Sequence, residues 1–491
     1  MRLRDAMFWS LLAVLPCSEA WAQAAPPAQP AARVGAPARA QSAAATPLPP
    51  GARTLQEALA ATYANSPTLQ AARAKLRATD EGVPQALAGW RPSLVVNGTA
   101  GHANGIQRTR NVLGGVKTDV TRDIATANTI LTQPLFRGGR TLASTNAAEN
   151  KVMAERARLI AAEQQVFSDT VNSYVGVIQA TQILALNINN EQVLARQLQA
   201  TRERFRVGEI TRTDVAQAEA AYALATAQRQ TGEGNLAVAR AAYARVVGAE
   251  PGDLVPPQPL NLPVKNVQEA GALAANNNPN VVATLFDDAA AKDAVDVAFS
   301  ALMPQLSLQA QAFNQNNTLT PHTAANGAQI MANLSVPIYQ GGAEHSFVRQ
   351  ARQIQQQTRQ QVDESRRSAI QLSTQAWETL ASARATADST RAAIRANRIA
   401  LEGVTREALV GSRTTLDVLN AQQAVLNTEV TLVQNLANLV IASHNVASAI
   451  GRLTARDLRV AVPLYDEAAY YNAVRDRWAG TGDYTTSQQG G

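Results

Sequence analysis

Two stretches of the sequence share one pattern: V-G-E-I-T-R-T-D-V-A-Q-A-E from Val207 to Glu219, and V-G-S-R-T-T-L-D-V-L-N-A-Q from Val410 to Gln422. In both, a Val-Gly pair follows a long alanine-rich segment, where a helix typically ends on a left-handed glycine. A threonine then precedes an aspartate by three residues, the spacing of a capping box that starts a new helix. Each stretch therefore predicts the tip of a helical hairpin, and the recurrence predicts an internal duplication.

Matching residues of the two copies keep fixed separations. Two pairs are 203 residues apart: Pro134 with Pro337, and Asp214 with Asp417. Two pairs further upstream are 212 residues apart: Pro67 with Pro279, and Pro92 with Pro304. The copies therefore differ by nine residues between these landmarks. We expect the difference in an exposed loop that joins two strands.

Long helices are the main predicted elements. Proline-free segments run from about residue 140 to 206 and from about 344 to 409, and a helix of that length spans roughly 100 Å. Apolar residues recur every seven positions, as interlocking helices require; they are Val152, Leu159 and Val166, and Ile160, Phe167 and Tyr174. Shorter helices return after each tip to about 247 and about 450, and two more are expected at 54–65 and 68–87.

Alternating residues predict two β-hairpins, at about 93–134 and about 305–337. In the second hairpin, one face is apolar and the other carries Ser, Asn and Gln. The apolar residues are Leu306, Leu308, Ala310 and Ala312 on one strand, and Ile330, Ala332, Leu334 and Val336 on the next. One face is suited to lipid or a core, and the other to water.

The N-terminal segment indicates export. Arg2 and Arg4, an apolar run and a small-residue cleavage site at 20–22 form a secretory signal peptide. The only cysteine, Cys17, lies within it, and lipid attachment at Cys17 stays an alternative. The expected organisation is a signal peptide (1–22), a Pro/Ala-rich disordered linker (23–53), a first repeat (54–250), an inter-repeat linker (251–265), a second repeat (266–465) and a C-terminal tail (466–491).

Composition excludes several kinds of function. The net charge of +6, from 44 basic and 38 acidic residues spread along the chain, does not indicate a nucleic-acid partner. The four histidines lack metal-ligand spacing, and motifs for nucleophilic catalysis or phosphate binding are missing. We therefore expect no metal, no cofactor and no enzymatic activity.

The paired strands favour an oligomer. Four strands are too few to close a barrel, and open strand edges cannot face lipid. Copies of the chain would therefore surround an axis, and the residues alone do not fix their number.

Three motifs, taken together, resemble the TolC family of outer-membrane efflux and secretion channels. They are the N-x-P helix starts, the P-[LI]-[FY]-x-G-G junctions at 134–139 and 337–342, and the V-G-x-x-T-x-x-D tips. The resemblance covers roughly 54–465. It implies a mainly α fold with a small β part, in which coiled-coil helices form an α-barrel and a homotrimer forms one twelve-stranded β-barrel in outer-membrane lipid. It also implies a periplasmic adaptor and an inner-membrane transporter of the ABC or RND type as partners.

The resemblance further implies that the tips close the periplasmic entrance. The residues carried over as the gate are Thr213, Asp214, Arg413, Asp417 and Asn420, and those carried over as adaptor-facing tips are Val207, Gly208, Thr211, Val410, Gly411 and Thr414. Arg413 would bond Thr213 or Asp214 of a neighbouring hairpin, while Asp417 would form an acidic ring. Asn420 stands where family members can carry a second aspartate, so the expected cation block is weaker. Ala408 stands where the first copy has Phe205, so an aromatic side chain that would lock the closed tip is missing from the second copy.

Two alternatives remain open. Asp214 and Asp417 would serve only as helix caps in one of them. In the other, the whole chain is a periplasmic coiled-coil scaffold or adaptor that never enters a membrane; paired amphipathic strands argue against it.

Overall fold

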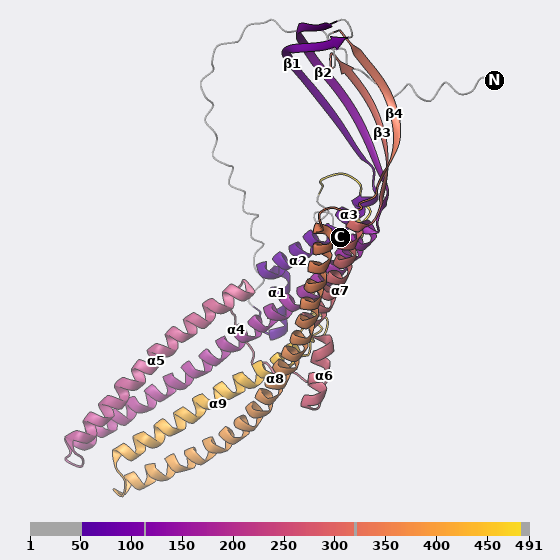
Figure 1. The fold of residues 1–491 in the computed structure, drawn as a ribbon. Helices are drawn as coiled ribbons and strands as arrows, with labels where there is room; N and C mark the ends of the chain where they lie inside the picture. Colours follow the sequence, from indigo (N-terminus) through magenta and orange to yellow (C-terminus); the bar gives the residue numbers. More distant parts are fainter. Residues whose placement is uncertain (1–51, 112–113, 319–321, 483–491) are drawn as a thin grey trace, which may run out of the picture. The chain divides into compact units, whose positions relative to one another are not determined.

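We describe a computed structural model of the chain over residues 52–111, 114–318 and 322–482 (Figure 1). The expected signal peptide with Cys17, nearly all of the expected linker and the last residues of the tail lie outside the described residues. Within the described part, no helix is both long and apolar enough to cross a membrane.

Each half of the described chain begins with two helices whose starts are set by side-chain caps. Ser66 and Asn278 each accept a backbone hydrogen bond, and each precedes a proline at the first helical position, where the missing N–H of proline has no partner to lose. The helices of the first half are α1 (Leu55–Asn65), α2 (Pro67–Asp80), α3 (Gly82–Leu87) and the 3₁₀ turn η1 (Ala88–Trp90). Those of the second are α6 (Val267–Asn277), α7 (Pro279–Phe299) and η2 (Ser300–Leu302).

The single helix expected over 68–87 is wrong, because the structure divides it into α2 and α3. Pro84 explains the break: it has no N–H to donate to the carbonyl of Asp80, and its ring clashes with that carbonyl in a continuous helix. The second half has no proline at the matching place, and α7 runs unbroken for 21 residues.

Two long helical hairpins follow the strands, as the sequence predicted. The first is α4 (Arg140–Arg206) with α5 (Arg212–Val247), and the second is α8 (Ala343–Leu409) with α9 (Thr415–Ala449). Both α4 and α8 contain 67 residues. Each begins directly after a glycine in the left-handed conformation, Gly139 and Gly342, with φ of 83°, which a side chain would disfavour.

The four strands form one antiparallel sheet in chain order (Figure 1). They are β1 (Ser93–Asn111), β2 (Gly114–Arg137), β3 (Gln305–Asn316) and β4 (Ala324–Ser335). β2 was expected to end at Pro134, but it continues to Arg137 through a register shift between Pro134 and Phe136. Such a bulge accommodates a proline, which cannot donate to the ladder.

The nine-residue difference between the copies does not lie in a longer loop. β1 and β2 stay paired from Gly105↔Val120 to Asn111↔Gly114, whereas the matching residues of the second copy connect β3 to β4. We call residues 105–111 and 114–120 the ladder extension. Because these residues keep pairing with each other, the extra chain lengthens two strands.

The sheet keeps the predicted separation of faces. Leu306 pairs with Leu334 and Ala310 with Ile330, so apolar side chains meet on one face. On the other face, the amides of Gln329 and Asn333 donate to Gln311 and Gln309 at 2.9 and 3.0 Å. Ile330 and Leu334 are 74% and 66% exposed, so the apolar face is uncovered in a single chain.

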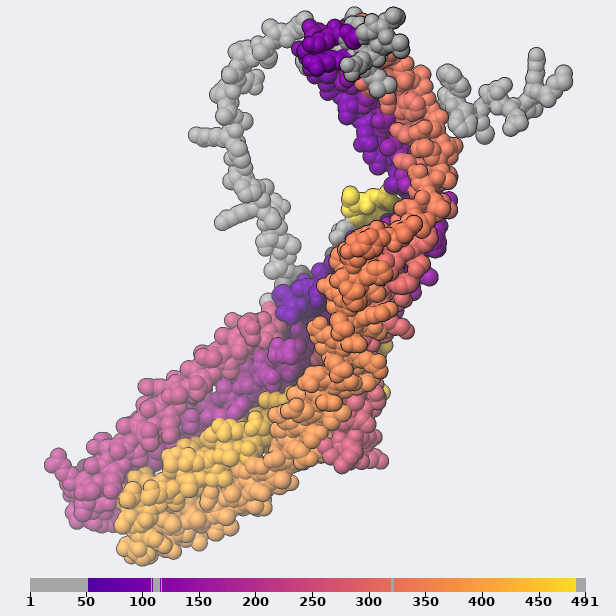
Figure 2. Space-filling view, viewed as in Figure 1, coloured from indigo at the N-terminus to yellow at the C-terminus, as the bar shows by residue number. Residues whose placement is uncertain are grey.

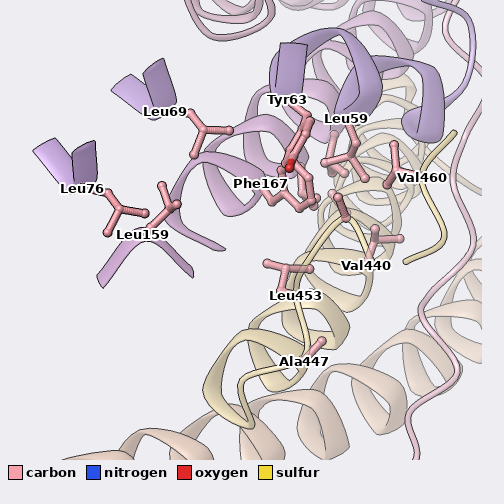
Figure 3. Packing of buried hydrophobic residues seen from close by; sticks show 14 of the residues in the cluster. Leu59, Tyr63, Leu69, Leu76, Leu159, Phe167, Val440, Ala447, Leu453 and Val460 are labelled. Atoms are coloured by element: carbon pink, nitrogen blue, oxygen red, sulfur yellow. The ribbon is translucent and has the colours of Figure 1, made fainter. Parts of the chain in front are cut away.

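The main hydrophobic core joins α1 and α2 to α4, α9 and the C-terminal segment (Figure 3). Phe167 of α4 is fully buried at its centre, and its ring lies 6.2 Å from that of Tyr63. The first predicted seven-residue set is confirmed on α4, since Val152, Leu159 and Val166 are all buried. In the second set, Phe167 and Tyr174 are fully buried and Ile160 is half-buried.

The C-terminal segment, with α10 (Ala469–Val474), packs on α1, α2 and α4 through arginine–aromatic contacts. The Arg73 guanidinium lies 4.6 Å from the Tyr63 ring and 5.0 Å from the Tyr465 ring, and Arg156 lies 5.4 Å from the Tyr471 ring. These are cation–π distances. They explain why the most aromatic stretch of the sequence is ordered against the helices.

Candidate functional site: the tips of the two helical hairpins

Each hairpin tip is built by one helix end and one helix start. After α4, Gly208 has φ of 80° and the N–H of Glu209 donates to the carbonyl of Arg204 at 3.0 Å. After α8, Gly411 has φ of 79° and the N–H of Ser412 donates to the carbonyl of Glu407 at 3.0 Å. This bond across a left-handed glycine satisfies carbonyls that the helix end leaves unpaired.

Both expected capping boxes are present. Thr211 donates to Asp214 Oδ2 from its backbone N–H at 3.0 Å and from its hydroxyl at 2.7 Å. Thr414 does the same to Asp417, at 3.0 and 2.8 Å. Each threonine hydroxyl also accepts the N–H of its aspartate. The two aspartates are therefore held in one orientation, and both cap a helix.

These hydrogen bonds set the charge of the tips. The hydroxyl and backbone N–H of Thr211 hold the pKa of Asp214 below its usual value. The backbone and hydroxyl donors of Thr414, aided by the charge of Arg413, do the same for the pKa of Asp417. A carboxylate that accepts several hydrogen bonds favours its ionised form, so Asp214 and Asp417 are both ionised at neutral pH.

Each tip also has an arginine–glutamate pair that crosses the turn and that the sequence analysis missed. In the first, Arg204 donates to Glu209 Oε1 from Nε at 3.0 Å and from Nη2 at 2.6 Å. In the second, Arg413 Nε donates to Glu407 Oε2 at 2.9 Å. The sequence contained a signal for these pairs, because residues of opposite charge stand five or six positions apart on the two sides of each Val-Gly turn. In the single chain, Arg413 is thus engaged within its own hairpin, and its bond to Thr213 or Asp214 stays a prediction.

The other predicted residues lie on the surface of the tips. Val207 and Val410 are 76% and 81% exposed, and Thr213 and Asn420 are exposed as well. On the face shown in Figure 2, no other described part of the chain covers either tip.

The fold combines two long helical hairpins with a four-stranded sheet that has one apolar face. The outer membrane efflux protein family matches this chain at residues 56–249 and 271–452. The chain belongs to that family, and it is an outer-membrane efflux protein.

Individual relatives extend over most of the chain. The outer membrane efflux protein BepC of Brucella suis is 36% identical over 423 residues, covering 85% of this chain and 90% of BepC. The outer membrane protein TolC of Escherichia coli is 24% identical over 409 residues, covering 80% and 81%. The crystal structure of the Campylobacter jejuni CmeC outer membrane channel superposes with a TM-score of 0.72 at 16% identity, covering 86% of this chain and 89% of CmeC.

Proposed function

We propose that the chain is the exit duct of a tripartite efflux pump or a type I secretion system. In this proposal, three copies assemble around one axis, and residues 54–250 and 266–465 act as two repeats of one unit. The observation that carries it is the four-stranded sheet, in which β1 and β4 each leave one edge without a partner strand among the described residues.

The edges and the apolar face support the trimer. All twelve residues of β4 are exposed in the single chain, and an open edge in lipid leaves backbone groups without hydrogen bonds. Pairing β4 of one copy with β1 of the next removes both edges. Three copies then give twelve strands in a closed barrel, with Leu94, Ile330 and Leu334 toward lipid and the Gln and Asn side chains toward water.

The helical hairpins would continue this duct into the periplasm. We propose that a periplasmic adaptor contacts the tips at Val207, Gly208, Thr211, Val410, Gly411 and Thr414, and that an inner-membrane transporter of the ABC or RND type supplies substrate. Exposed valines give such a contact apolar area, and the left-handed glycines hold its shape.

The periplasmic gate would consist of Thr213, Asp214, Arg413, Asp417 and Asn420. In the closed state, Arg413 would leave Glu407 and donate to Thr213 or Asp214 of a neighbouring hairpin. Hydrogen bonds to charged groups contribute about 1.5–3 kcal/mol each, so a few would keep the entrance closed and still yield to a partner. Three copies of Asp417 would form an acidic ring that binds cations.

Conduction through this duct needs no covalent chemistry, and we propose that the chain is not an enzyme. Substrates would be those that the transporter supplies, exported proteins and small molecules among them. The competing proposal is a periplasmic scaffold without a membrane span. It does not explain the sheet, because the uncovered apolar face would be exposed to water.

The experiment is single-channel conductance of the purified oligomer in planar bilayers. We expect wild type to form pores that are mostly closed. The open probability should rise in Arg413→Ala, and the block by divalent cations should weaken in Asp417→Ala. Glu378→Ala, an exposed carboxylate change far from the tip on α8, serves as the control and should leave the block unchanged. Correctly folded oligomer that forms no pore would support the scaffold instead.

A further inference from the structure

The ladder extension has no counterpart among the described residues of the second half, where β3 ends at Asn316 and β4 begins at Ala324. Pairing between β2 and β3 starts at Ala125↔Asn316, while β1 and β2 remain paired out to Asn111↔Gly114. The extension is therefore a two-stranded ribbon that continues past the four-stranded part of the sheet. Two strands alone bury little surface, and Arg108 and Lys117 on this ribbon are exposed.

Most charged residues of the two β-hairpins lie in the ladder extension or close to it. Residues 305–337 contain no Asp, Glu, Lys or Arg, and residues 93–136 contain six, all between 108 and 123. They are Arg108, Arg110, Lys117, Asp119, Arg122 and Asp123. Four of the six are basic, so the far end of the first hairpin carries a net positive charge.

Two of these basic residues lie directly opposite each other. Arg108 pairs with Lys117 in the same unbroken register that pairs Leu94 with Leu131. The even spacing from Leu94 to Arg108 puts both pairs on one face of the ladder. Like charges in a cross-strand pair destabilise a sheet, and an anion bound between them removes that repulsion.

The position of the pair matches a membrane surface. The strand ends that join the helices lie on the periplasmic side of the proposed duct, so the extension lies on the outer side. Arg108 lies fourteen residues along the strand from Leu94, in the same unbroken register. Fourteen residues span roughly 46 Å of strand, which is roughly 33 Å along the axis of a duct whose strands tilt by about 45°, close to the roughly 30 Å thickness of the hydrocarbon core.

We propose that the ladder extension binds the phosphorylated headgroups of the outer-leaflet glycolipid, lipopolysaccharide, with Arg108 and Lys117 as the phosphate-binding pair. The apolar face below contacts the acyl chains of the same lipid layer. The inference rests on the proposal that the sheet spans the outer membrane, and it adds a lipid partner to it.

The test compares lipid binding by three detergent-purified oligomers in native mass spectrometry. They are wild type, Arg108→Gln/Lys117→Gln, and Arg384→Gln/Arg395→Gln as a control of equal charge on the exposed surface of α8. The probes are bisphosphorylated lipid A, its dephosphorylated form and inorganic phosphate. Each basic group near an anionic lipid surface contributes about a fivefold factor in affinity, so we expect about a thirtyfold loss in the first variant at low salt.

Wild-type and control proteins should bind the phosphorylated lipid alike, and Arg108→Lys/Lys117→Arg should retain binding, because charge is preserved. Equal binding by wild type and Arg108→Gln/Lys117→Gln overturns the inference, as does equal preference for the dephosphorylated lipid or displacement by millimolar inorganic phosphate. Pore formation separates the two proposals: pores without lipid preference overturn only this inference, whereas wild-type oligomer without pores overturns the proposed function.

Discussion

Arg204 and Glu407 occupy the same position in the two hairpins, 203 residues apart, and carry opposite charges. Each forms an ion pair across its own tip, Arg204 with Glu209 and Glu407 with Arg413. The duplicated tips therefore share backbone geometry but differ in charge arrangement. In the first, the cation lies on the long helix, and in the second it lies in the turn.

This arrangement predicts opposite effects for the two partners of the second pair. Glu407→Gln removes the intrahairpin competitor for Arg413, so Arg413 should bond the neighbouring tip more often and open probability should fall. Arg413→Ala removes the closing bond and should raise it. Single-channel recording measures both, with Glu402→Gln as a matched loss of an exposed ion pair, since Glu402 pairs with Arg406 one turn away.

If both substitutions raise the open probability, the pair itself keeps the tip closed, and the proposed competition between Glu407 and the neighbouring hairpin is wrong. If neither changes it, Arg413 has no part in gating. An exposed pair contributes only about 0–1 kcal/mol to stability, so the oligomer should melt at an unchanged temperature in all three variants.

Capping and cation binding by Asp417 can be separated with two variants. In Asp417→Asn, the amide oxygen can still accept from Thr414, so the helix start should survive while cation block weakens. Thr414→Ala removes the hydroxyl of the cap and should cost about 1 kcal/mol locally, with the charge of Asp417 retained. Amide hydrogen exchange at residues 415–418 should therefore rise in Thr414→Ala and stay near wild type in Asp417→Asn. A block equally strong in Asp417→Asn and wild type would reduce Asp417 to a helix cap.

The sequence predicted the long hairpins well because local rules determine them. Gly208 and Gly411 end helices, Thr211 and Thr414 start them, and no proline interrupts α4 or α8. The sequence did not predict the structure where it depends on which strand or side chain a residue pairs with. The paired strands of the ladder extension lack a strong apolar alternation, and the pairs formed by Glu407 and Arg204 depend on how the turns fold back.

Asp80 of α2 predicts a pH dependence of stability. It is fully buried and neither carboxylate oxygen has a hydrogen-bond partner among the described residues. Burial raises its pKa to about 6, opposed by the charges of Arg156 and Arg77 and supported by those of Glu81 and Glu467. Because the folded state holds the proton more tightly than the unfolded chain, whose pKa is about 3.9, the contribution of Asp80 is full below pH 4 and is lost as pH rises through 6.

The measurement is the unfolding temperature of wild type and Asp80→Asn between pH 5 and pH 8. We expect the difference between them to grow in favour of Asp80→Asn as pH rises, since the amide carries no charge to bury. Asp457→Asn is the control, because Asp457 is an exposed helix-turn carboxylate. Parallel pH profiles for wild type and Asp80→Asn would show that the buried carboxyl does not titrate in this range.

Two phenylalanines of α4 test how much the hydrophobic core contributes to the free energy of unfolding: Phe167 is the test and Phe205 is the control. Phe167 is fully buried between α1 and α9, whereas Phe205 near the tip is 44% exposed. Phe167→Ala leaves a cavity and should lower the free energy of unfolding by about 3–5 kcal/mol. Phe205→Ala should change it by less than about 1 kcal/mol, because water already reaches the ring. Chemical denaturation of the two variants, followed by helical circular dichroism, decides it: equal destabilisation would mean that the tip is as tightly packed as the core, contrary to the exposed fractions of the two rings.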